Sequence, residues 1–543
     1  MVVIIKEMKI RLENLILFFL IICSLSCSSK NDELIIDIDQ YKDKLRGFWL
    51  GGCIANWTGL PTENQRIDFP FFTDSDFGKD KYDYVTNQNP WGADDDTDIE
   101  YVYQYAIEKF NNYKLTGQQI SSAWQDHIGL PKLWVSNLAA LGQMQNGIIP
   151  PETSLPENNP MWEMIDAQLT TEIFGVLAPG RPDIALEMAH LPIRTTAYLH
   201  SRWASEFYVI MHSMALLAKP SLTRKEQIFW LAAQARKRIP DWSYIANMYD
   251  FVKAEYEANP DKDNWEQTRD KVAQRYQYEV NADYNYRYPW DSGINFAASM
   301  VSLFYGEGDY KKTIRIGCMS GWDSDNPTST WGGLLGFLYG HKGLQKHFEK
   351  KDFSDDYFIG RSRYNLPIST DNFTDMANRG INIINSVVVE EMNGLISNNN
   401  WIIPINKNPI KKDEHIKTII PWILIEDTDT RWNYIGFKTK KNQWNASGGS
   451  LTFGYKNCKA KIKFKGKAVQ YYGYRSPKGG KVKIILDGKN FGEFNLKTDV
   501  SEYGQYYVKI FEQENLAESY HTLEIIGDES SNEKTIDMLS IIP

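Results

Sequence analysis

Apolar residues follow a helical spacing over most of the chain. From residue 36 to residue 396 they recur every three or four positions, which is the spacing of amphipathic helices. Ile99, Val102 and Ala106, for example, fall on one face of a predicted helix. Strand patterns are scarce in this part, so we predict a large all-helical domain over residues 36–397.

The spacing changes to a period of two toward the C-terminus. Residues 398–418 are rich in Asn, Pro, Lys and Ile and are interpreted as a linker. Beyond them, Ala460, Ile462 and Phe464 alternate with lysines, which is typical of a strand with one buried face. Short strands of this kind continue to the last residue, so residues 419–543 are predicted to form an antiparallel β-sandwich.

The N-terminus has the organisation of an export signal. Basic residues precede an apolar run at residues 15–23, which is too short to span a bilayer but suits the core of a signal peptide. Cys27 follows small residues, as at the cleavage site of a bacterial lipoprotein. We therefore expect a lipoprotein signal peptide over residues 1–27, lipidation at Cys27 and a tether over residues 28–35; a plain secretory signal is the alternative.

An exported lipoprotein belongs to the bacterial cell envelope, where the lipid anchor at the outer membrane is the only membrane contact that we expect. The net charge argues against nucleic-acid binding. It is -9 and no long basic run occurs, whereas nucleic-acid binding needs a clustered Lys and Arg surface. We therefore expect no nucleic-acid partner.

Two acidic clusters carry the most specific chemical signal. They are Asp94-Asp95-Asp96-Thr97-Asp98 and Asp323-Ser324-Asp325-Asn326, and each precedes a predicted helix. Carboxylates this dense repel one another unless a cation lies among them, and divalent ions such as Mg²⁺ prefer oxygen ligands. The helix dipole would stabilise one or two acids at a helix start, but it does not account for two matching clusters. We predict that the fold brings the clusters together around metal.

Three motifs make the sequence resemble the ADP-ribosylglycohydrolase family. Residues 43–63 are similar to its opening pattern of Arg-Gly, Gly-Asp and Gly-x-Pro-x-Glu. Asp94-Asp95-Asp96-Thr97 resembles its Thr-Asp-Asp-Thr, and Gly321-Trp322-Asp323-Ser324-Asp325-Asn326 resembles its Gly-Gly-Asp-Thr-Asp-Thr. The order and spacing of the motifs agree over residues 41–340.

The resemblance implies an orthogonal helical bundle whose central cleft holds two divalent cations. Mg²⁺ is the expected ion, with Mn²⁺ and Ca²⁺ as alternatives. The implied ligands are Asp94, Asp95, Asp96, Asp323, Asp325 and Asn326. Glu63 corresponds to the family's loop glutamate, which lies beside the metals and the scissile bond.

Family members cleave the bond at C1 of a ribofuranose. Two close cations can orient the sugar hydroxyls and lower the pKa of a bridging water. Surrounding carboxylates stabilise the oxocarbenium character of the transition state. We assign acid/base catalysis and positioning of the water to Glu63 and Asp95; for Glu63, a surface acid without a catalytic role is the alternative.

Three positions depart from the family pattern. Asp94 and Asn326 stand where the family has Thr, and Asn56 stands where it has an early Asp. Asp94 keeps an oxygen ligand and adds charge, whereas Asn326 offers only a carbonyl oxygen. Metal binding is expected to persist, while metal preference and substrate stay open.

Six residues are candidates for contact with the substrate. They are Asn56, Trp91, Gln168, His200, Asn295 and Trp322. Trp91 and Trp322 flank the acidic clusters and could stack on a sugar or a base. For the two tryptophans, Gln168, His200 and Asn295, packing inside the domain is the alternative.

The predicted sandwich is rich in aromatic residues. Trp432, Trp444, Tyr471, Tyr472, Tyr474 and Tyr506 give a density typical of carbohydrate-binding modules. Residues 469–495 also resemble galactose-binding jelly rolls. A purely structural accessory domain is the alternative.

Together these features favour a metal-dependent hydrolase that cleaves an N- or O-glycosidic bond at C1 of a ribosyl or other furanosyl sugar. Export favours a glycan, glycoside or nucleoside outside the cytoplasm as its partner. Hydrolysis of an ADP-ribosyl bond on a protein or small molecule is the alternative. A non-catalytic protein that captures a glycan or nucleotide is the second alternative, and the departures at Asp94 and Asn326 support it.

Overall fold

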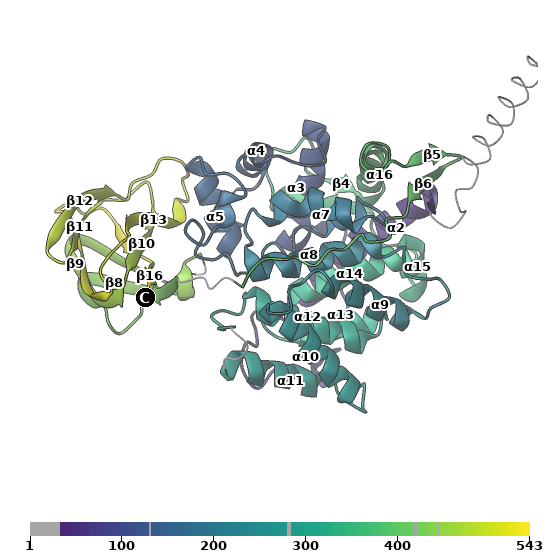
Figure 1. The fold of residues 1–543 in the computed structure, drawn as a ribbon, viewed down its shortest axis with the longest axis horizontal. Coiled ribbons are helices and arrows are strands. Elements are labelled where there is room, and N and C mark those ends of the chain that lie inside the picture. Colours follow the sequence, from purple (N-terminus) through teal and green to yellow (C-terminus); the bar gives the residue numbers. More distant parts are fainter. Residues whose placement is uncertain (1–32, 130–131, 280–283, 418–421, 444) are drawn as a thin grey trace, which may run out of the picture.

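The computed structural model of the protein describes residues 33–543 except 130–131, 280–283, 418–421 and 444. Figure 1 shows a helical domain and a smaller β-sheet domain at the C-terminal end. The predicted fold class, a helical bundle followed by an antiparallel β-sandwich, is confirmed. The predicted signal peptide, its lipidation site Cys27 and the residue Trp444 lie outside the described part of the chain.

The helical domain contains helices α2 to α16. Their bounds are α2 (Ile38–Gly59), α3 (Asp95–Phe110), α4 (Gly117–His127), α5 (Val135–Gln145), α6 (Ile173–Val176), α7 (Pro182–Ile193), α8 (Leu199–Met214), α9 (Arg224–Arg236), α10 (Tyr244–Ala258), α11 (Glu266–Ala273), α12 (Ser292–Gly306), α13 (Tyr310–Met319), α14 (Asp325–Tyr339), α15 (His341–His347) and α16 (Phe373–Glu390). Val102 and Ala106 of α3 are buried, as the helical spacing predicts. Among the described helices, none has both the length and the apolar character needed to cross a membrane.

Helices α2 and α14 pack with their backbones in contact. A Cβ atom on Gly336 of α14 would lie 2.2 Å from the carbonyl oxygen of Gly47, and one on Gly51 of α2 would lie 2.4 Å from that of Gly332. Glycine is needed here because a side chain would collide with the facing helix. The contact sets the end of α2 beside the start of α14, where the second acidic cluster lies.

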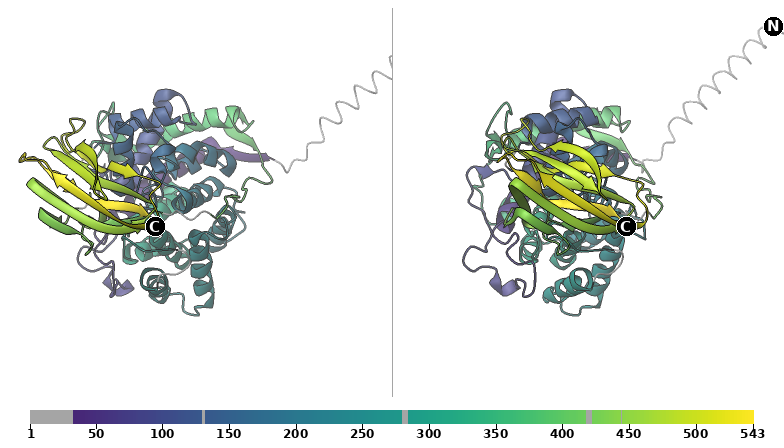
Figure 2. Two further views of the ribbon diagram at one scale, coloured as in Figure 1. Left: turned by 60° about the vertical axis from the view of Figure 1, so that its left-hand side comes forward. Right: turned by 90° about the vertical axis from the view of Figure 1, so that its left-hand side faces the viewer.

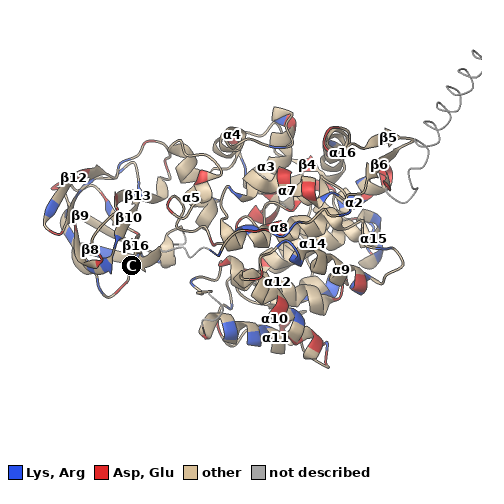
Figure 3. Cartoon of the chain, in the orientation of Figure 1, with Lys and Arg blue, Asp and Glu red and all other residues tan. Residues whose placement is uncertain are grey.

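Two antiparallel sheets form the C-terminal domain. Their strands are β7 (Ile423–Glu426), β8 (Asn433–Lys441), β9 (Ser450–Gly466), β10 (Ala468–Arg475), β11 (Lys481–Leu486), β12 (Lys489–Asn495), β13 (Gln505–Gln513), β14 (Ser519–Gly527), β15 (Lys534–Ile536) and β16 (Met538–Ile542). One sheet has the order β13-β10-β16-β7, and the other has the order β12-β11-β14-β9-β15 with β8 also paired to β9. Ile462 and Phe464 of β9 are buried, whereas Lys461, Lys463 and Lys465 are exposed, as the period of two predicts. Figure 3 shows basic residues along these strands and acidic residues in the middle of the helical domain.

The aromatic residues of the sandwich serve mostly as core. Trp432, Tyr471 and Tyr472 are buried. Tyr474 and Tyr506 are half-buried against each other, with 4.4 Å between their ring centroids. At these positions the aromatic density reflects packing, so it does not supply the exposed platform that stacking on a sugar requires.

Two predicted boundaries differ from the structure. A small sheet at the edge of the helical domain has the order β1-β6-β5, with β1 (Glu33–Asp37), β5 (Leu395–Ser397) and β6 (Asn400–Pro404), and another joins β2 (Trp91–Gly92), β3 (Asp356–Phe358) and β4 (Asp371–Asn372). Part of the predicted tether 28–35 and part of the predicted linker 398–418 are therefore strands. The reason is that Trp401 and Ile403 bury their apolar surface in the helical domain despite the polar composition around them.

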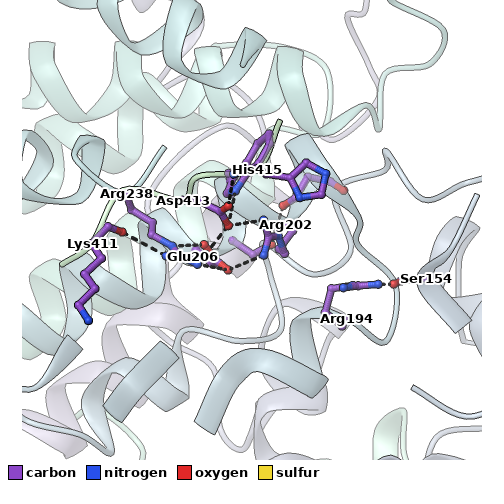
Figure 4. A network of polar contacts seen from close by, with 11 residues as sticks. Ser154, Arg194, Arg202, Glu206, Arg238, Lys411, Asp413 and His415 are labelled. Carbon is purple, nitrogen blue, oxygen red and sulfur yellow. Dashed lines mark hydrogen bonds and ion pairs between the residues drawn. The ribbon is translucent and has the colours of Figure 1, made fainter. Parts of the chain in front are cut away.

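The segment after β6 is held on the helical domain by an ion network (Figure 4). Asp413 pairs with Arg202 and Arg238, and both arginines also pair with Glu206. The indole N–H of Trp203 donates a further hydrogen bond of 3.2 Å to Asp413. The four charged side chains are at most 19% exposed. This part of the predicted linker is thus strapped to α8 and to the chain after α9.

The sandwich packs directly on the helical domain. Strand β13 lies against α5, where the Gln505 amide donates a hydrogen bond of 3.0 Å to Gln145. Tyr472, Tyr507 and Met538 belong to the buried core of the helical domain. Tyr288 donates its hydroxyl to Glu426 across the boundary. Figure 2 shows the sandwich on this end of the helical domain from two further sides.

Candidate metal centre

The two acidic clusters, far apart in the sequence, meet in the helical domain. Asn326 donates from Nδ2 to Oδ1 of Asp96 over 3.2 Å. Carboxylate oxygens of Glu63, Asp323 and Asp325 all lie within 4.8 Å of one another. The structure therefore brings together the acidic groups that the sequence pattern paired.

The first cluster is fixed by the start of α3. Asp94 is the N-cap residue, and its side chain accepts a hydrogen bond of 2.8 Å from the backbone N–H of Asp95. Asp95 and Asp96 follow in the first turn, where the helix dipole favours negative charge. Asp96 also accepts a bond of 3.2 Å from Nδ2 of Asn56, so two asparagine amides fix its orientation.

The second cluster is fixed by the turn before α14. Gly321 and Trp322 have φ angles of +94° and +55°, and this left-handed turn carries the chain into Asp323. The backbone N–H of Asp323 donates to Oδ1 of Asn295 over 3.2 Å. Asn295 in turn donates to the carbonyl oxygens of Pro289 and Asp291 at 2.7 and 2.9 Å. Asn295, predicted to contact the substrate, thus holds the backbone of a candidate ligand.

Glu63 lies in the turn that follows α2. The side-chain amide of Asn64 donates to Oε1 of Glu63 over 2.9 Å, and the backbone N–H of Asn64 donates to the Trp322 carbonyl oxygen over 2.9 Å. Burial, and after it the Asp94 carboxylate, raises the pKa of Glu63 to about 7. Its carboxyl group is therefore able to hold or release a proton near neutral pH.

Four carboxyl groups around Glu63 have no cationic partner in the described part of the chain. Burial, and after it the repulsion of neighbouring carboxylates, raises the pKa of Asp95, Asp96, Asp323 and Asp325 well above the usual value. None of the four forms an ion pair with a Lys or Arg among the residues that the structure describes. Buried carboxylates of this density are costly unless a cation compensates them.

The donor atoms present fit divalent cations. Besides the carboxylates, the Oδ1 atoms of Asn56 and Asn326 are buried and have no hydrogen-bond partner in the described part of the chain. Carboxylate and amide oxygens are the donors that Mg²⁺ and related ions prefer. Asp98 is different, because it forms a fully buried ion pair of 2.8 Å with Arg363 and is already compensated.

A cleft of about 470 Å³ opens onto these acids, and this size suits a small sugar-containing ligand. The predicted site residues that line it are Glu63, Asp94, Asp95, Asp96, Asp323 and Asp325. Lys132, Trp134, Trp290 and Arg361 line it as well. The cleft thus combines a carboxylate group with cationic and aromatic side chains.

The structure places three of the predicted substrate contacts outside this cleft. Trp91 and Trp322 are fully buried, and their indole N–H groups donate hydrogen bonds of 3.0 and 2.8 Å inside the domain. His200 borders a separate cavity of about 620 Å³ between the domains, where its ring stacks on Tyr244 at 3.9 Å. Proximity to a motif in the sequence does not decide which way a side chain faces.

Two further candidates support the cleft from behind. Gln168 is buried and donates to the carbonyl oxygen of Ser292 over 3.2 Å, while its neighbours Asp166 and Leu169 line the cleft. Asn56 is also buried and holds Asp96. Both side chains are therefore buried beside the site and do not line the cleft.

Sequence reasoning missed the side chains of the cleft that come from loops outside the three motifs. They include Lys132, Trp134, Trp290 and Arg361. The signal that could have found them is Asp98, whose carboxylate needs a cationic partner when it is buried. The pattern Arg361-Ser362-Arg363 supplies it, since Ser362 and Arg363 both bind Asp98 and bring Arg361 to the cleft.

Comparison with known proteins identifies a family for most of the helical domain. A sequence model described as ADP-ribosylglycohydrolase matches residues 37–359. No curated protein matches the chain. A solved ADP-ribosylglycohydrolase-related protein complex is 13% identical over 64% of this chain and 98% of that chain, with a TM-score of 0.37.

The chain is also similar to two solved carbohydrate-binding modules. CBM35 from Cellvibrio japonicus Abf62 is 10% identical over 22% of this chain and 93% of that chain, with a TM-score of 0.20. A family 35 carbohydrate binding module from Clostridium thermocellum is 8% identical over 22% of this chain and 96% of that chain, with a TM-score of 0.19.

Proposed function

Because the chain belongs to the ADP-ribosylglycohydrolase family, we propose that it is a metal-dependent glycoside hydrolase. The bond cleaved is an N- or O-glycosidic bond at C1 of a ribosyl or other furanosyl sugar. The observation that carries this proposal is the convergence of the Glu63, Asp323 and Asp325 carboxylates within 4.8 Å beside a sugar-sized cleft.

Two divalent cations complete the proposed site, with Mg²⁺ as the first choice and Mn²⁺ or Ca²⁺ as alternatives. Their ligands would be Asp94, Asp95, Asp96, Asp323, Asp325 and Asn326. When bound, such ions neutralise the carboxylates, hold sugar hydroxyls and lower the pKa of water. The chain prepares this site by fixing Asp96 with two asparagine amides and Asp323 with Asn295.

Glu63 is the proposed acid/base residue. Its carboxyl group lines the cleft, where it would give a proton to the departing group and take one from the attacking water. Asp95, which also lines the cleft, would orient that water. The other carboxylates stabilise positive charge that develops at C1.

The proposed substrate is a glycan, glycoside or nucleoside outside the cytoplasm. The predicted export signal over residues 1–27 and lipidation at Cys27, which would anchor the protein at the outer membrane, support this choice. An ADP-ribosyl bond on a protein or small molecule is the second candidate, and the family match favours it.

The test is the release of sugar from furanosides, nucleosides and ADP-ribosyl-arginine with Mg²⁺, Mn²⁺, Ca²⁺ or EDTA. We expect turnover of a furanosyl substrate with metal, none in EDTA, and losses of about a hundredfold or more in Glu63→Gln and Asp323→Ala. Gln65→Ala is the matched control, because Gln65 lines the cleft without a proposed role. Turnover of ADP-ribosyl-arginine alone would select the second candidate. No turnover on any substrate would contradict both.

A further inference from the structure

One arginine of the cleft has no acidic partner. Arg363 pairs with the buried Asp98, whereas Arg361, two residues earlier, lines the cleft and forms no ion pair with the residues that the structure describes. Lys132 also lines the cleft, but it directs its ammonium group to the carbonyl oxygen of Arg361 over 2.7 Å. The Arg361 guanidinium is therefore free to bind a negatively charged group of a ligand.

Trp57 and Gly92 fix the position of this guanidinium. The Cζ atom of Arg361 lies 4.3 Å from the centroid of the Trp57 ring, and the Trp57 indole N–H donates to the Gly92 carbonyl oxygen over 3.0 Å. A Cβ atom on Gly92 would lie 2.7 Å from Nη1 of Arg361, so only glycine leaves room for the group. Stacking on Trp57 covers one face of the guanidinium, while its N–H donors point outward in the plane of the group.

The same contacts place the guanidinium beside the first acidic cluster. Trp57 follows Asn56 in α2, and Asn56 donates to Asp96 over 3.2 Å. Gly92 comes two residues before Asp94, which lines the cleft. The guanidinium therefore belongs to the wall of the proposed reaction site. Because stacking already orders the side chain, it loses little conformational entropy when a ligand binds.

We propose that Arg361 binds a carboxylate of the substrate and thereby selects a furanosyl sugar linked to a uronic acid. A guanidinium and a carboxylate form two parallel N–H···O bonds, a geometry that a neutral sugar cannot offer. A single unpaired guanidinium suits a single negative charge, because the carboxyl groups of the cleft repel any further one. This inference rests on the proposed function, because it narrows the glycan or glycoside of that function to an acidic one.

The first experiment measures binding without turnover. Two disaccharides, arabinofuranosyl-galacturonic acid and arabinofuranosyl-galactose, differ only in the carboxylate, and the Glu63→Gln background removes the proposed acid/base group. Calorimetric titration in Mg²⁺ is expected to show about tenfold tighter binding of the acid. Arg361→Ala is expected to lower this ratio of affinities to about one. Arg361→Lys keeps the charge but loses the paired donors, so a ratio of about two to three is expected.

Gly92→Ala tests the same site without removing charge. The new Cβ atom displaces the guanidinium and is expected to lower the ratio to about three or less. Arg431→Ala is the matched control, because Arg431 belongs to the sandwich and its side chain is 48% exposed. It is expected to keep the ratio of the unchanged chain.

Two results would overturn the proposal. One is equal affinity for the two disaccharides before Arg361 is changed. The other is a ratio that survives Arg361→Ala. A lower melting temperature of this variant with an unchanged ratio would assign Arg361 a structural role alone.

A kinetic experiment separates failure of this site from failure of the proposed function. With both disaccharides as substrates, Arg361→Ala is expected to raise KM for the acid about tenfold more than KM for the neutral sugar. Turnover of both by the wild type with equal KM would reject the carboxylate site and keep the hydrolase. Selective binding without turnover would keep the site and reject the hydrolase. Turnover of ADP-ribosyl-arginine alone, lost in Arg361→Ala, would assign the guanidinium to a phosphate and overturn the uronic acid.

Discussion

At the residue scale, the carboxylates of the candidate metal centre destabilise the fold while they supply oxygen atoms that can bind a cation. Asp325 is buried, and burial followed by the repulsion of Glu63 raises the pKa of its carboxyl group well above the usual value. In the metal-free protein this carboxylate destabilises the folded state, because burying a charge without a partner is less favourable than burying a neutral group of the same shape. Buried acids that destabilise the metal-free protein are typical of a functional site.

We therefore expect Asp325→Asn to stabilise the protein in EDTA by about 1–3 kcal/mol, since the amide removes the charge and keeps the shape. Mg²⁺ at about a hundred times its dissociation constant is expected to stabilise the wild type by about 2.7 kcal/mol and the variant far less. Calorimetric melting of both proteins in EDTA and in Mg²⁺ measures these changes.

Asp352→Asn is the control for this exchange, because the Asp352 side chain is 86% exposed and is expected to leave both melting temperatures unchanged. A variant at Asp325 that melts below the wild type in EDTA and still responds fully to Mg²⁺ would contradict the assignment of Asp325 as a ligand.

A second residue-scale prediction concerns pH. The ring of His521 faces two acceptors, with Nδ1 at 2.6 Å from Asp487 and Nε2 at 2.8 Å from the Ala517 carbonyl oxygen. Burial lowers the pKa of His521, but these hydrogen bonds outweigh it, so the pKa is raised above 6.5. The folded state therefore prefers the protonated ring. Its contribution of about 1 kcal/mol is complete below pH 6.5 and is lost as the pH rises through the folded pKa.

The measurement is the difference in unfolding free energy between the wild type and His521→Gln from pH 5.5 to pH 9. We expect the difference to be largest at low pH and to shrink above neutral pH. Parallel pH curves for the two proteins would show that folding does not change the pKa of His521, against this prediction.

At the element scale, the crossing of α2 and α14 aligns the two halves of the site. We expect Gly51→Ala to destabilise the protein by about 2–3 kcal/mol, because its Cβ would lie 2.4 Å from the Gly332 carbonyl oxygen and force the helices apart. Since α14 begins at Asp325, the separation is also expected to weaken stabilisation by Mg²⁺. Denaturant unfolding with and without Mg²⁺ measures both effects.

Gly52→Ala provides a control on the same helix. Its Cβ would meet nothing closer than Thr97 Cγ2 at 3.9 Å, which is ordinary contact. The higher helix propensity of Ala then predicts no loss, or a gain of up to about 1 kcal/mol. Equal losses at the two neighbouring positions would refute the close crossing.

Some secondary-structure elements could be predicted from local sequence patterns, and others could not. Alternation predicts β9, because Ile462 and Phe464 must be buried on one face whatever the partner strand is. The pairing of β1 with β6 joins the first and last segments of the helical domain's sequence. No local pattern encodes a contact between residues so far apart in the chain. The polar composition around Trp401 predicted a linker, whereas the burial of its ring makes this segment a strand packed on the helical domain.

At the scale of the whole molecule, the same limit applies to the site. Asp96 and Asp323 could be assigned to one centre in advance, because dense carboxylates need a shared cation and the motifs fix their order. Trp322 could not be placed, since the turn at Gly321 directs its ring inward against Phe71 at 4.8 Å. Trp134 and Arg361 reach the cleft only through the packing of distant loops.

The segment between the two domains is held on the helical domain through Asp413, and this contact can be tested. Asp413→Ala leaves Arg202 and Arg238 with only Glu206 as a carboxylate partner among the described residues, which is expected to cost about 2–4 kcal/mol. The released segment should then be cut faster by a protease at residues 405–417, as measured by mass spectrometry of limited digests. Lys412→Ala is the control, because its ion pair with Asp241 is exposed and contributes little. If both variants are cut at the rate of the wild type, the network does not hold this segment on the helical domain.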